Sequence, residues 1–332
     1  MRILLKYLKP YKWLVVLTLL LATINQGFSL LDPIIFGNLV DLANRYINGG
    51  KQMTLDQFMF SFTRPWGVIA LLLASIGVAM VSRIAKNFQD YFLNVIVQKF
   101  GAKVFTDGLK HAMKLPYQEF EDQRSGETLS VLTKVRSDTE RFMHYFINIL
   151  FGVLVGVVVV MVYASWKIHW SVPIAYFFGI FLITAITNFL SGKIKTIQKN
   201  IVKQTTALAG STTESLRNIE LVKSLGLTQQ EVERLNKNTY KILGMELTKV
   251  KRIRSISFVQ GTFVNTLRQV ILFILMWLIF DGQMSPGQLV TMQIYSFFVF
   301  GPLQEIGNII LSYREAEASL NNFHNLMNKQ PE

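Results

Sequence analysis

Long apolar stretches with few or no charges recur along this chain, and polar stretches separate them. A helix needs about 20 apolar residues to cross the hydrocarbon core of a membrane. Six stretches reach or approach that length, and they predict an all-α membrane protein with six spans. The predicted spans are 13–36, 66–82, 142–166, 168–192, 255–280 and 282–304.

The composition agrees with a chain whose solvent is partly lipid. Hydrophobic residues make up 51% of the sequence and charged residues only 17%, whereas soluble domains carry about 25% charged residues. The absence of cysteine excludes disulfides, thiolate metal sites and cysteine nucleophiles. The basic start followed by an apolar run is similar to a signal peptide, but residues 13–31 carry no charge and no small-residue cleavage site. We therefore interpret it as a retained first span.

The basic residues are distributed very unequally between the segments that join the spans. The net charge is +13, and 29 of the 34 Lys and Arg residues lie in 1–12, 83–141, 193–254 and the tail after Glu305. Basic residues gather on the cytoplasmic side of a membrane. Both termini and both long segments are therefore predicted to be cytoplasmic, and the charge indicates no nucleic-acid partner. The expected location is the inner membrane of a bacterial cell.

The two long polar segments are predicted to be helical extensions of the spans. Segment 193–254 contains no proline, and segment 83–141 contains only Pro116. A continuous helix over 66–115 would measure roughly 75 Å at 1.5 Å per residue, of which lipid accounts for about 30 Å. We therefore expect two helical hairpins that project into the cytoplasm, with turns at Pro116 and within 211–226. A coiled-coil stalk is the alternative interpretation of this pattern.

Four groups of residues, in chain order on this six-span frame, resemble one known family. The groups are 31–33 with 36–41; 115–120 with 126–127, 132–133 and Asp138; 214–226; and 282–285 with 287–290, Tyr295 and 301–303. On these residues the whole chain resembles the transmembrane domain of ATP-binding-cassette (ABC) exporters with the type-1 exporter fold. It departs from the family in the tail, where 318–323 replace an arginine-rich mark.

The resemblance implies partners that this sequence does not itself contain. The family carries a nucleotide-binding domain, expected after residue 332, which would bind ATP and Mg. No phosphate-binding loop occurs here, because 191–194 lack both the upstream glycine and the final hydroxyl of that motif. We expect either a shortened exporter half or a separate ATPase subunit, and favour the first. A second transmembrane half, most simply another copy of this chain, completes the translocator.

The resemblance also implies two coupling helices, at the tips of the two hairpins, that would dock on the ATPase. A solvated turn is the alternative for each. The candidate coupling residues are Tyr117, Glu119, Phe120 and Glu121 in the first hairpin, and Glu214, Leu216 and Arg217 in the second. Catalytic residues and metal ligands are not predicted, since the four histidines are scattered and form no ligand-spaced pair.

Arg268 is the one charge inside the fifth predicted span and marks a candidate substrate cavity. A charge at mid-membrane costs about 2.5–3.5 kcal/mol, so Arg268 should face the bundle interior or water. Contact with substrate, a salt bridge with Glu305 and snorkelling to the interface all remain open. The other candidate cavity residues are Asn265, Gln269, Gln293 and Glu305, with Asn25, Gln26 and Tyr295 as further lining residues.

Together these observations predict the transmembrane half of an ATP-driven exporter. It would move an amphipathic substrate (a lipid, drug or peptide) by alternating access coupled to ATP hydrolysis in the associated domain. Two alternatives are a membrane receptor or scaffold whose hairpins bind a non-ATPase partner, and an ion-coupled carrier. A carrier would usually show internal repeats or paired intramembrane carboxylates, and none is evident. The sequence does not identify the substrate.

Overall fold

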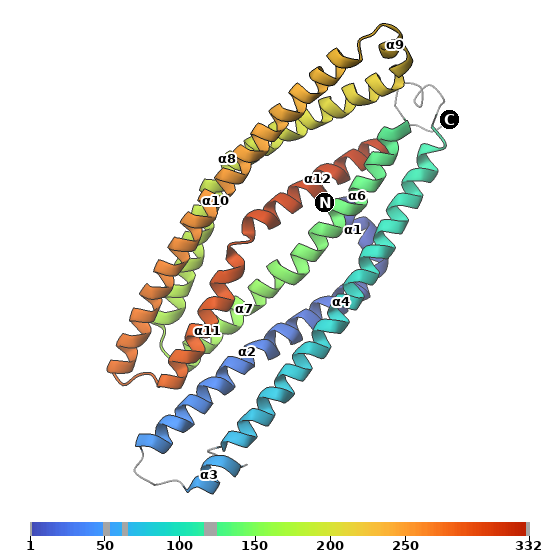
Figure 1. The fold of residues 1–332 in the computed structure, drawn as a ribbon. Helices are drawn as coiled ribbons and strands as arrows, with labels where there is room; N and C mark the ends of the chain where they lie inside the picture. The colour runs from blue at the N-terminus through green and yellow to red at the C-terminus, as the bar shows by residue number, and fades with distance from the viewer. Residues whose placement is uncertain (1, 49–53, 62–65, 116–124, 330–332) are drawn as a thin grey trace. The chain divides into compact units, whose positions relative to one another are not determined.

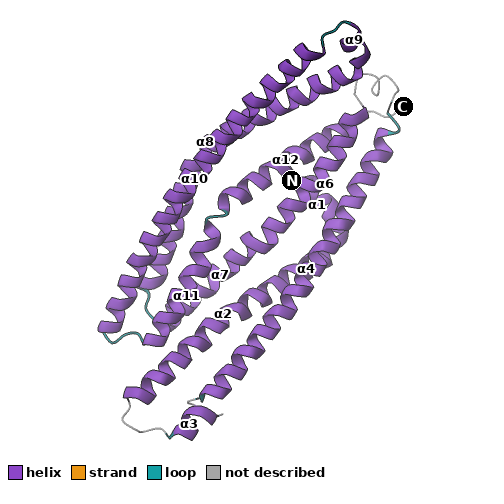
Figure 2. Ribbon diagram, viewed as in Figure 1, coloured by secondary structure: helices purple, strands orange, loops and turns teal. Residues whose placement is uncertain are grey.

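The computed structural model describes residues 2–48, 54–61, 66–115 and 125–329. All regular structure within these ranges is helical (Figure 2). The chain divides into two compact units, Met1–Ile180 with Arg268–Glu332, and Phe181–Leu267. Both boundaries between the units fall inside long helices.

Unit 1 contains most of the helices in the described ranges (Figure 1). The first part of α8 and the end of α10 also belong to this unit. The elements that lie wholly within it are α1 (Arg2–Leu8), η1 (Lys9–Tyr11), α2 (Lys12–Asn48), α3 (Leu55–Phe60), α4 (Val68–Ala112), α6 (Ser125–Tyr145), η2 (Phe146–Phe151), α7 (Gly152–Lys167), α11 (Pro286–Leu303) and α12 (Ile306–Met327). Helix runs without a break from α6 through η2 to α7, and η2 is a π-helical turn.

Six helical segments in the described ranges are long and apolar enough to cross a membrane. Their surfaces carry large apolar side chains, such as Trp277 at 66% and Phe280 at 82% exposure. Apolar surface of this kind is stable against lipid but not against water. The predicted all-α fold with six spans is therefore confirmed.

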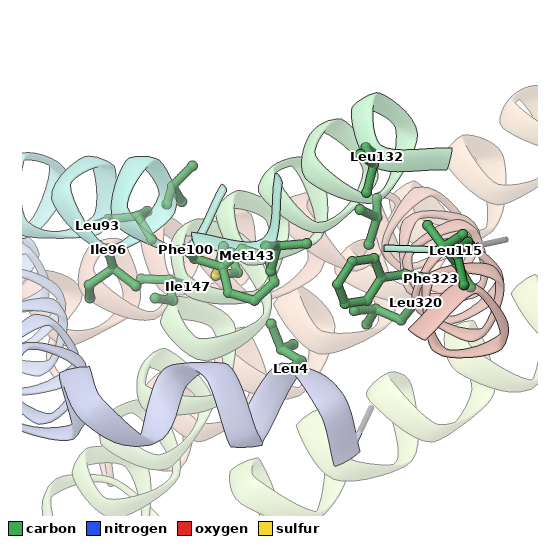
Figure 3. Packing of buried hydrophobic residues seen from close by; sticks show 14 residues of the cluster. Leu4, Leu93, Ile96, Phe100, Leu115, Leu132, Met143, Ile147, Leu320 and Phe323 are labelled. Carbon is green, nitrogen blue, oxygen red and sulfur yellow. The ribbon is translucent and has the colours of Figure 1, made fainter. Parts of the chain in front are cut away.

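Unit 1 has a hydrophobic core between α1, the C-terminal half of α4, α6, η2 and the C-terminal part of α12 (Figure 3). Leu93, Ile96 and Phe100 of α4 recur at helical spacing on the face that enters this core. The tight packing is clear at Gly108, where an added Cβ would overlap Leu132 and approach Phe323. These elements form a packed body, because side chains from α1, α4, α6, η2 and α12 bury one another.

Polar contacts tie α6 to α12 beside that core. The Ser319 hydroxyl donates a hydrogen bond to the Asp138 carboxylate, and both residues are buried. One turn away, the Arg141 guanidinium forms an ion pair with Glu315 at 3.1 Å, which is largely solvated. The predicted family residue Asp138 therefore has a structural partner, far away in the sequence.

Unit 2 is a helical hairpin made by the rest of α8 (Ser171–Arg217), by α9 (Ile219–Ser224) and by the first part of α10 (Thr228–Phe280). Figure 1 shows α8 and α10 side by side with α9 at the tip. The Gln260 amide donates to the Thr187 hydroxyl at 2.6 Å across the hairpin. The turn falls inside the predicted 211–226 region, and it ends at Gly226, whose φ of 69° favours glycine.

The helix bounds differ in detail from those the sequence predicts. The continuous helix expected over 66–115 is α4, which spans Val68–Ala112 and ends four residues before Pro116. The fifth predicted span and its polar extension form one helix, α10, of 53 residues. The sixth is α11, which starts at Pro286 because Ser285 caps it, whereas the apolar pattern continues back to residue 282.

Candidate functional site

The Asp41 carboxylate of α2 binds the start of α11. It accepts hydrogen bonds from the Gly287 backbone amide at 2.7 Å and from the Ser285 hydroxyl at 2.6 Å. The Ser285 hydroxyl oxygen also accepts from the Gln288 amide at 3.2 Å, and the Gln288 side chain accepts from the Ser285 amide at 2.9 Å. An anion here satisfies amides that an isolated helix leaves free and lies at the positive end of the helix dipole.

Small residues let α2 and α11 approach closely at the same place. A Cβ added at Gly37 would overlap the Thr291 hydroxyl and the Gly287 carbonyl, and a Cβ at Gly287 would overlap the Gly37 carbonyl. The Thr291 hydroxyl donates to the Pro33 carbonyl at 2.9 Å. One turn further, the Tyr295 hydroxyl donates to the Leu30 carbonyl at 2.6 Å. We call these contacts the α2–α11 seam.

The seam brings together two of the four groups that carry the family resemblance. Gly37 and Asp41 come from the first group, and Gly287 and Tyr295 from the last. From the sequence, these four residues were known only as positions that resemble the family. The structure assigns them a shared role, because together they close one helix against another.

A groove of about 770 Å³ lies along α2 and α4, on the side where α11 contributes Ile294 and Phe298. Four of its polar residues form two hydrogen-bonded pairs. The Ser75 hydroxyl donates to the Asp32 carboxylate, and the Ser82 hydroxyl donates to the Asn25 side-chain oxygen at 2.9 Å. The groove therefore contains hydrogen-bonded polar side chains within the apolar parts of α2 and α4.

Basic residues occupy one end of this groove. Arg83 and Lys86 both line it, and the Lys86 ammonium donates to Asp90 at 2.9 Å and to the Asn148 side-chain oxygen at 2.8 Å. Asn148 belongs to the π-helical turn η2. Lys86 is therefore neutralised by its own helix, and the π turn supplies a further acceptor.

The Arg268 guanidinium of α10 lies over the Phe297 ring of α11, 3.2 Å from its centroid. Its Nε is buried without a hydrogen-bond partner among the described residues, and so is the side-chain oxygen of Gln293, one turn from Phe297. Glu305, which the sequence suggested as a salt-bridge partner of Arg268, instead accepts from the Asn308 amide at 2.6 Å. Arg268 therefore makes a cation–π contact, and the salt bridge with Glu305, one of the three alternatives, is not formed.

The other candidate cavity residues are exposed or have contacts of their own. Asn265 and Gln269 are exposed on α10. Asn25 bonds to α4, and Tyr295 bonds to α2. Gln26 lies against α7, because a Cβ at Gly156 would stand 3.1 Å from its side-chain nitrogen.

Three candidate coupling residues lie at the end of α8. Glu214, Leu216 and Arg217 are exposed, and Leu216 is 64% exposed although it is apolar. Between them, buried Ser215 donates to Glu231, which also forms an ion pair with Arg234 on α10. The candidates Tyr117, Glu119, Phe120 and Glu121 lie outside the described residues.

Asp32 is the residue that sequence reasoning missed as a site. It is the one charge within the predicted span 13–36, as Arg268 is within 255–280. The same test for intramembrane charge would have selected it. The sequence analysis used Asp32 only as part of a family motif, and its position in the groove depends on the packing of α4 against α2.

Six apolar helices and long polar extensions of α8 and α10, together with the α2–α11 seam, define the membrane domain of a transporter. The model of the family described as "ABC transporter transmembrane region" matches residues 15–303. The chain belongs to this family, and it is an integral membrane protein with the transmembrane domain of an ABC exporter.

Similar proteins occur in several bacteria and in other organisms. The "Transport/processing ATP-binding protein ComA" of Streptococcus pneumoniae is 25% identical over 254 residues, covering 74% of this chain and 35% of that protein. The "Uncharacterized ABC transporter ATP-binding protein YwjA" of Bacillus subtilis is 23% identical, covering 98% and 54%. The chain thus spans between about one third and one half of the length of these relatives.

A solved structure supports the fold. The chain is similar to one described as "Structure of a bacterial Atm1-family ABC exporter with ATP bound", with a TM-score of 0.76 at 15% identity. The match covers 96% of this chain and 54% of that one. At this identity the likeness concerns the fold alone.

Proposed function

We propose that this chain is the transmembrane half of an ATP-driven exporter that moves an amphipathic substrate by alternating access. ATP hydrolysis would occur in an associated nucleotide-binding domain, fused or separate, which binds ATP and Mg. A second transmembrane half, most simply another copy of the chain, completes the pathway. The protein would lie in a bacterial inner membrane with both termini cytoplasmic, as its basic residues favour.

The observation that carries this proposal is the length of α10 and the exposed tip beside it. Its 53 residues measure about 80 Å, and lipid accounts for about 30 Å. The polar end of the hairpin carries Leu216 of α8, an exposed apolar side chain flanked by Glu214 and Arg217. Such a tip suits a groove on an ATPase surface, because it offers an apolar anchor between charges.

The hairpin is also suited to transmit a displacement. Two contacts hold α8 and α10 together at the tip: the Ser215 hydroxyl of α8 donates to Glu231, and the Arg234 guanidinium donates to the Ser215 hydroxyl at 3.4 Å. The Gln260–Thr187 bond joins them again 29 residues further along α10 from Glu231. Movement of the tip by closing ATPase domains would therefore carry the hairpin as a body. Substrate is coupled to this cycle only if the inward and outward states bind it differently.

The names of relatives support export without agreeing on cargo. One is a "Beta-(1-->2)glucan export ATP-binding/permease protein NdvA" of Rhodopseudomonas palustris, 20% identical. Another is the "ABC-type oligopeptide transporter ABCB9" of Mus musculus, also 20% identical. The same fold serves unrelated cargoes, so the substrate must be sought in the chain's own residues.

A test of coupling need not know the substrate. These 332 residues contain no cysteine, so Ile47→Cys at the exposed end of α2 gives one spin-label site within them, and any cysteine in the ATPase part is replaced by Ser. We expect ATP to change the distance between the labels of two copies in the assembled transporter, and Leu216→Glu to abolish that change. Leu243→Glu, the same substitution at an exposed residue in α10, is the control.

Two results would overturn the proposal. One is a label distance that does not respond to ATP in the unsubstituted assembly. The other is a response in Leu216→Glu equal to that of the Leu243→Glu control, since the tip would then not transmit the movement.

A further inference from the structure

Asp32 is a carboxylate in an apolar helix, and the described residues provide no cation to pair with it. It is the one charged residue in 13–36, and its side chain is exposed to the groove along α2 and α4. Its contact is the hydroxyl of Ser75, a neutral donor. A single hydroxyl leaves most of the carboxylate's hydrogen-bonding capacity unused.

The basic end of the groove does not neutralise this charge. Ser75 and Arg83 both lie on α4, eight residues apart, which corresponds to about 12 Å along the helix. Lys86 lies further still and is paired with Asp90 and Asn148. Between the two ends, Asn25 and Ser82 bond to each other. The Asp32 end therefore has a net negative charge of its own.

Three phenylalanines line the same groove as Asp32. Phe28 and Phe36 lie one turn before and one turn after Asp32 on α2, and both line the groove. Phe298 and Ile294 of α11 line it as well. The faces of aromatic rings attract cations, most strongly ammonium groups removed from water. A carboxylate among phenylalanines therefore favours a cation attached to an apolar body.

We propose that this groove binds an amphipathic primary amine, with the protonated amine paired to Asp32 and the apolar part against Phe28, Phe36 and Phe298. The inference rests on the proposed exporter function and names a substrate class for it. Ser75 orients the carboxylate, so that its second oxygen faces the amine. The amine could belong to a drug-like molecule or to a phospholipid such as phosphatidylethanolamine.

Direct binding tests the site without requiring transport. The assembled transporter, in nanodiscs of phosphatidylglycerol and without nucleotide, is titrated with the fluorescent amine dansylcadaverine and with its neutral N-acetyl derivative. We expect Asp32→Asn to weaken binding of the amine by about tenfold or more, a difference of about 1.4 kcal/mol. Binding of the acetyl derivative should be weak and unchanged, and Asp32→Glu should keep amine selectivity.

Asp56→Asn is the matched control, because Asp56 is an exposed acid on α3 outside the groove. Amine binding by Asp32→Asn equal to that of Asp56→Asn would overturn the proposal. So would equal binding of the amine and its acetyl derivative by the unsubstituted protein. If Asp32→Asn fails to fold, the amine site is still tested by comparing how the unsubstituted protein binds the amine and its acetyl derivative.

A second arm distinguishes the sources of the amine. Nanodiscs that also contain phosphatidylethanolamine should weaken dansylcadaverine binding if the lipid occupies the site, and leave it unchanged if the ligand is a non-lipid amine. Both outcomes support an amine-binding site and differ only in the source of the amine. Failure of the amine-binding test leaves the coupling test with labelled Ile47 unaffected, so a wrong substrate class and a wrong exporter proposal give different results.

Discussion

The Gly287 amide of α11 donates a hydrogen bond of 2.7 Å to the Asp41 carboxylate of α2, across 246 residues of sequence. This bond and the Ser285 hydroxyl bond hold the first turn of α11 on α2. Both helices belong to the same compact unit. The stability of this unit should therefore depend on a small set of polar and small residues at the seam.

Replacing Asp41 by Ala should destabilise the protein by about 1–3 kcal/mol. The Ser285 hydroxyl and the Gly287 amide would each lose an acceptor, and the helix start would lose its anion. Thermal unfolding in detergent or nanodiscs measures this. Asn38→Ala on the same helix, where the side chain is exposed, should change the midpoint little. Equal midpoints for both variants would contradict the assigned role of Asp41.

Gly37→Ala should cost about 1–3 kcal/mol, because the added methyl group would overlap Thr291 and the Gly287 backbone. Gly27→Ala on the same helix is the control, since nothing lies within 4 Å of the added Cβ. The control should be neutral or stabilising by up to about 1 kcal/mol, as alanine favours helix more than glycine does. The idea fails if Gly37→Ala is as stable as Gly27→Ala.

Asp138→Ala should be more damaging than Glu315→Ala. The Asp138 carboxylate is buried with Ser319, and removing it leaves a buried hydroxyl without its acceptor, at a cost of about 1–3 kcal/mol. Glu315 forms a largely solvated ion pair with Arg141, which is worth about 0–1 kcal/mol. Unfolding midpoints of the two variants provide the comparison, and the reverse order would refute the assignment.

Arg268→Met should leave stability unchanged or raise it. The Nε of Arg268 is buried without a partner among the described residues, and an apolar side chain of similar length keeps the contact with Phe297. A loss above about 2 kcal/mol would mean that the guanidinium makes stabilising interactions beyond the ring contact. The measurement is again thermal unfolding, with Arg141→Met as the exposed arginine for comparison.

The prediction of six apolar helices was correct because it depends on local properties. A stretch such as 255–280 must be helical in lipid, where each backbone amide needs a partner within its own segment. The helix extends into the polar region because no proline interrupts residues 193–254, which is again a local property. The family prediction was also confirmed, since its motifs are read directly from the chain.

The surroundings of the predicted site residues could not be derived in the same way, because they depend on which helix faces meet. Arg268 and Glu305 carry opposite charges, yet Arg268 lies on Phe297 and Glu305 bonds to Asn308. The sequence groups Asn25 with Arg268, whereas in the structure Asn25 faces Ser82. The coupling and cavity residues remain predictions.

The length and number of the apolar stretches along the chain were enough to define the apolar helices and their number, since these depend on each segment's own free energy in lipid or water. The meeting of Asp41 with Gly287, and of Asp32 with Ser75, was decided by tertiary packing alone. Rotating a helix by one residue turns a side chain by about 100°, so the same polar residue faces a groove, a neighbouring helix or lipid according to how the helices pack.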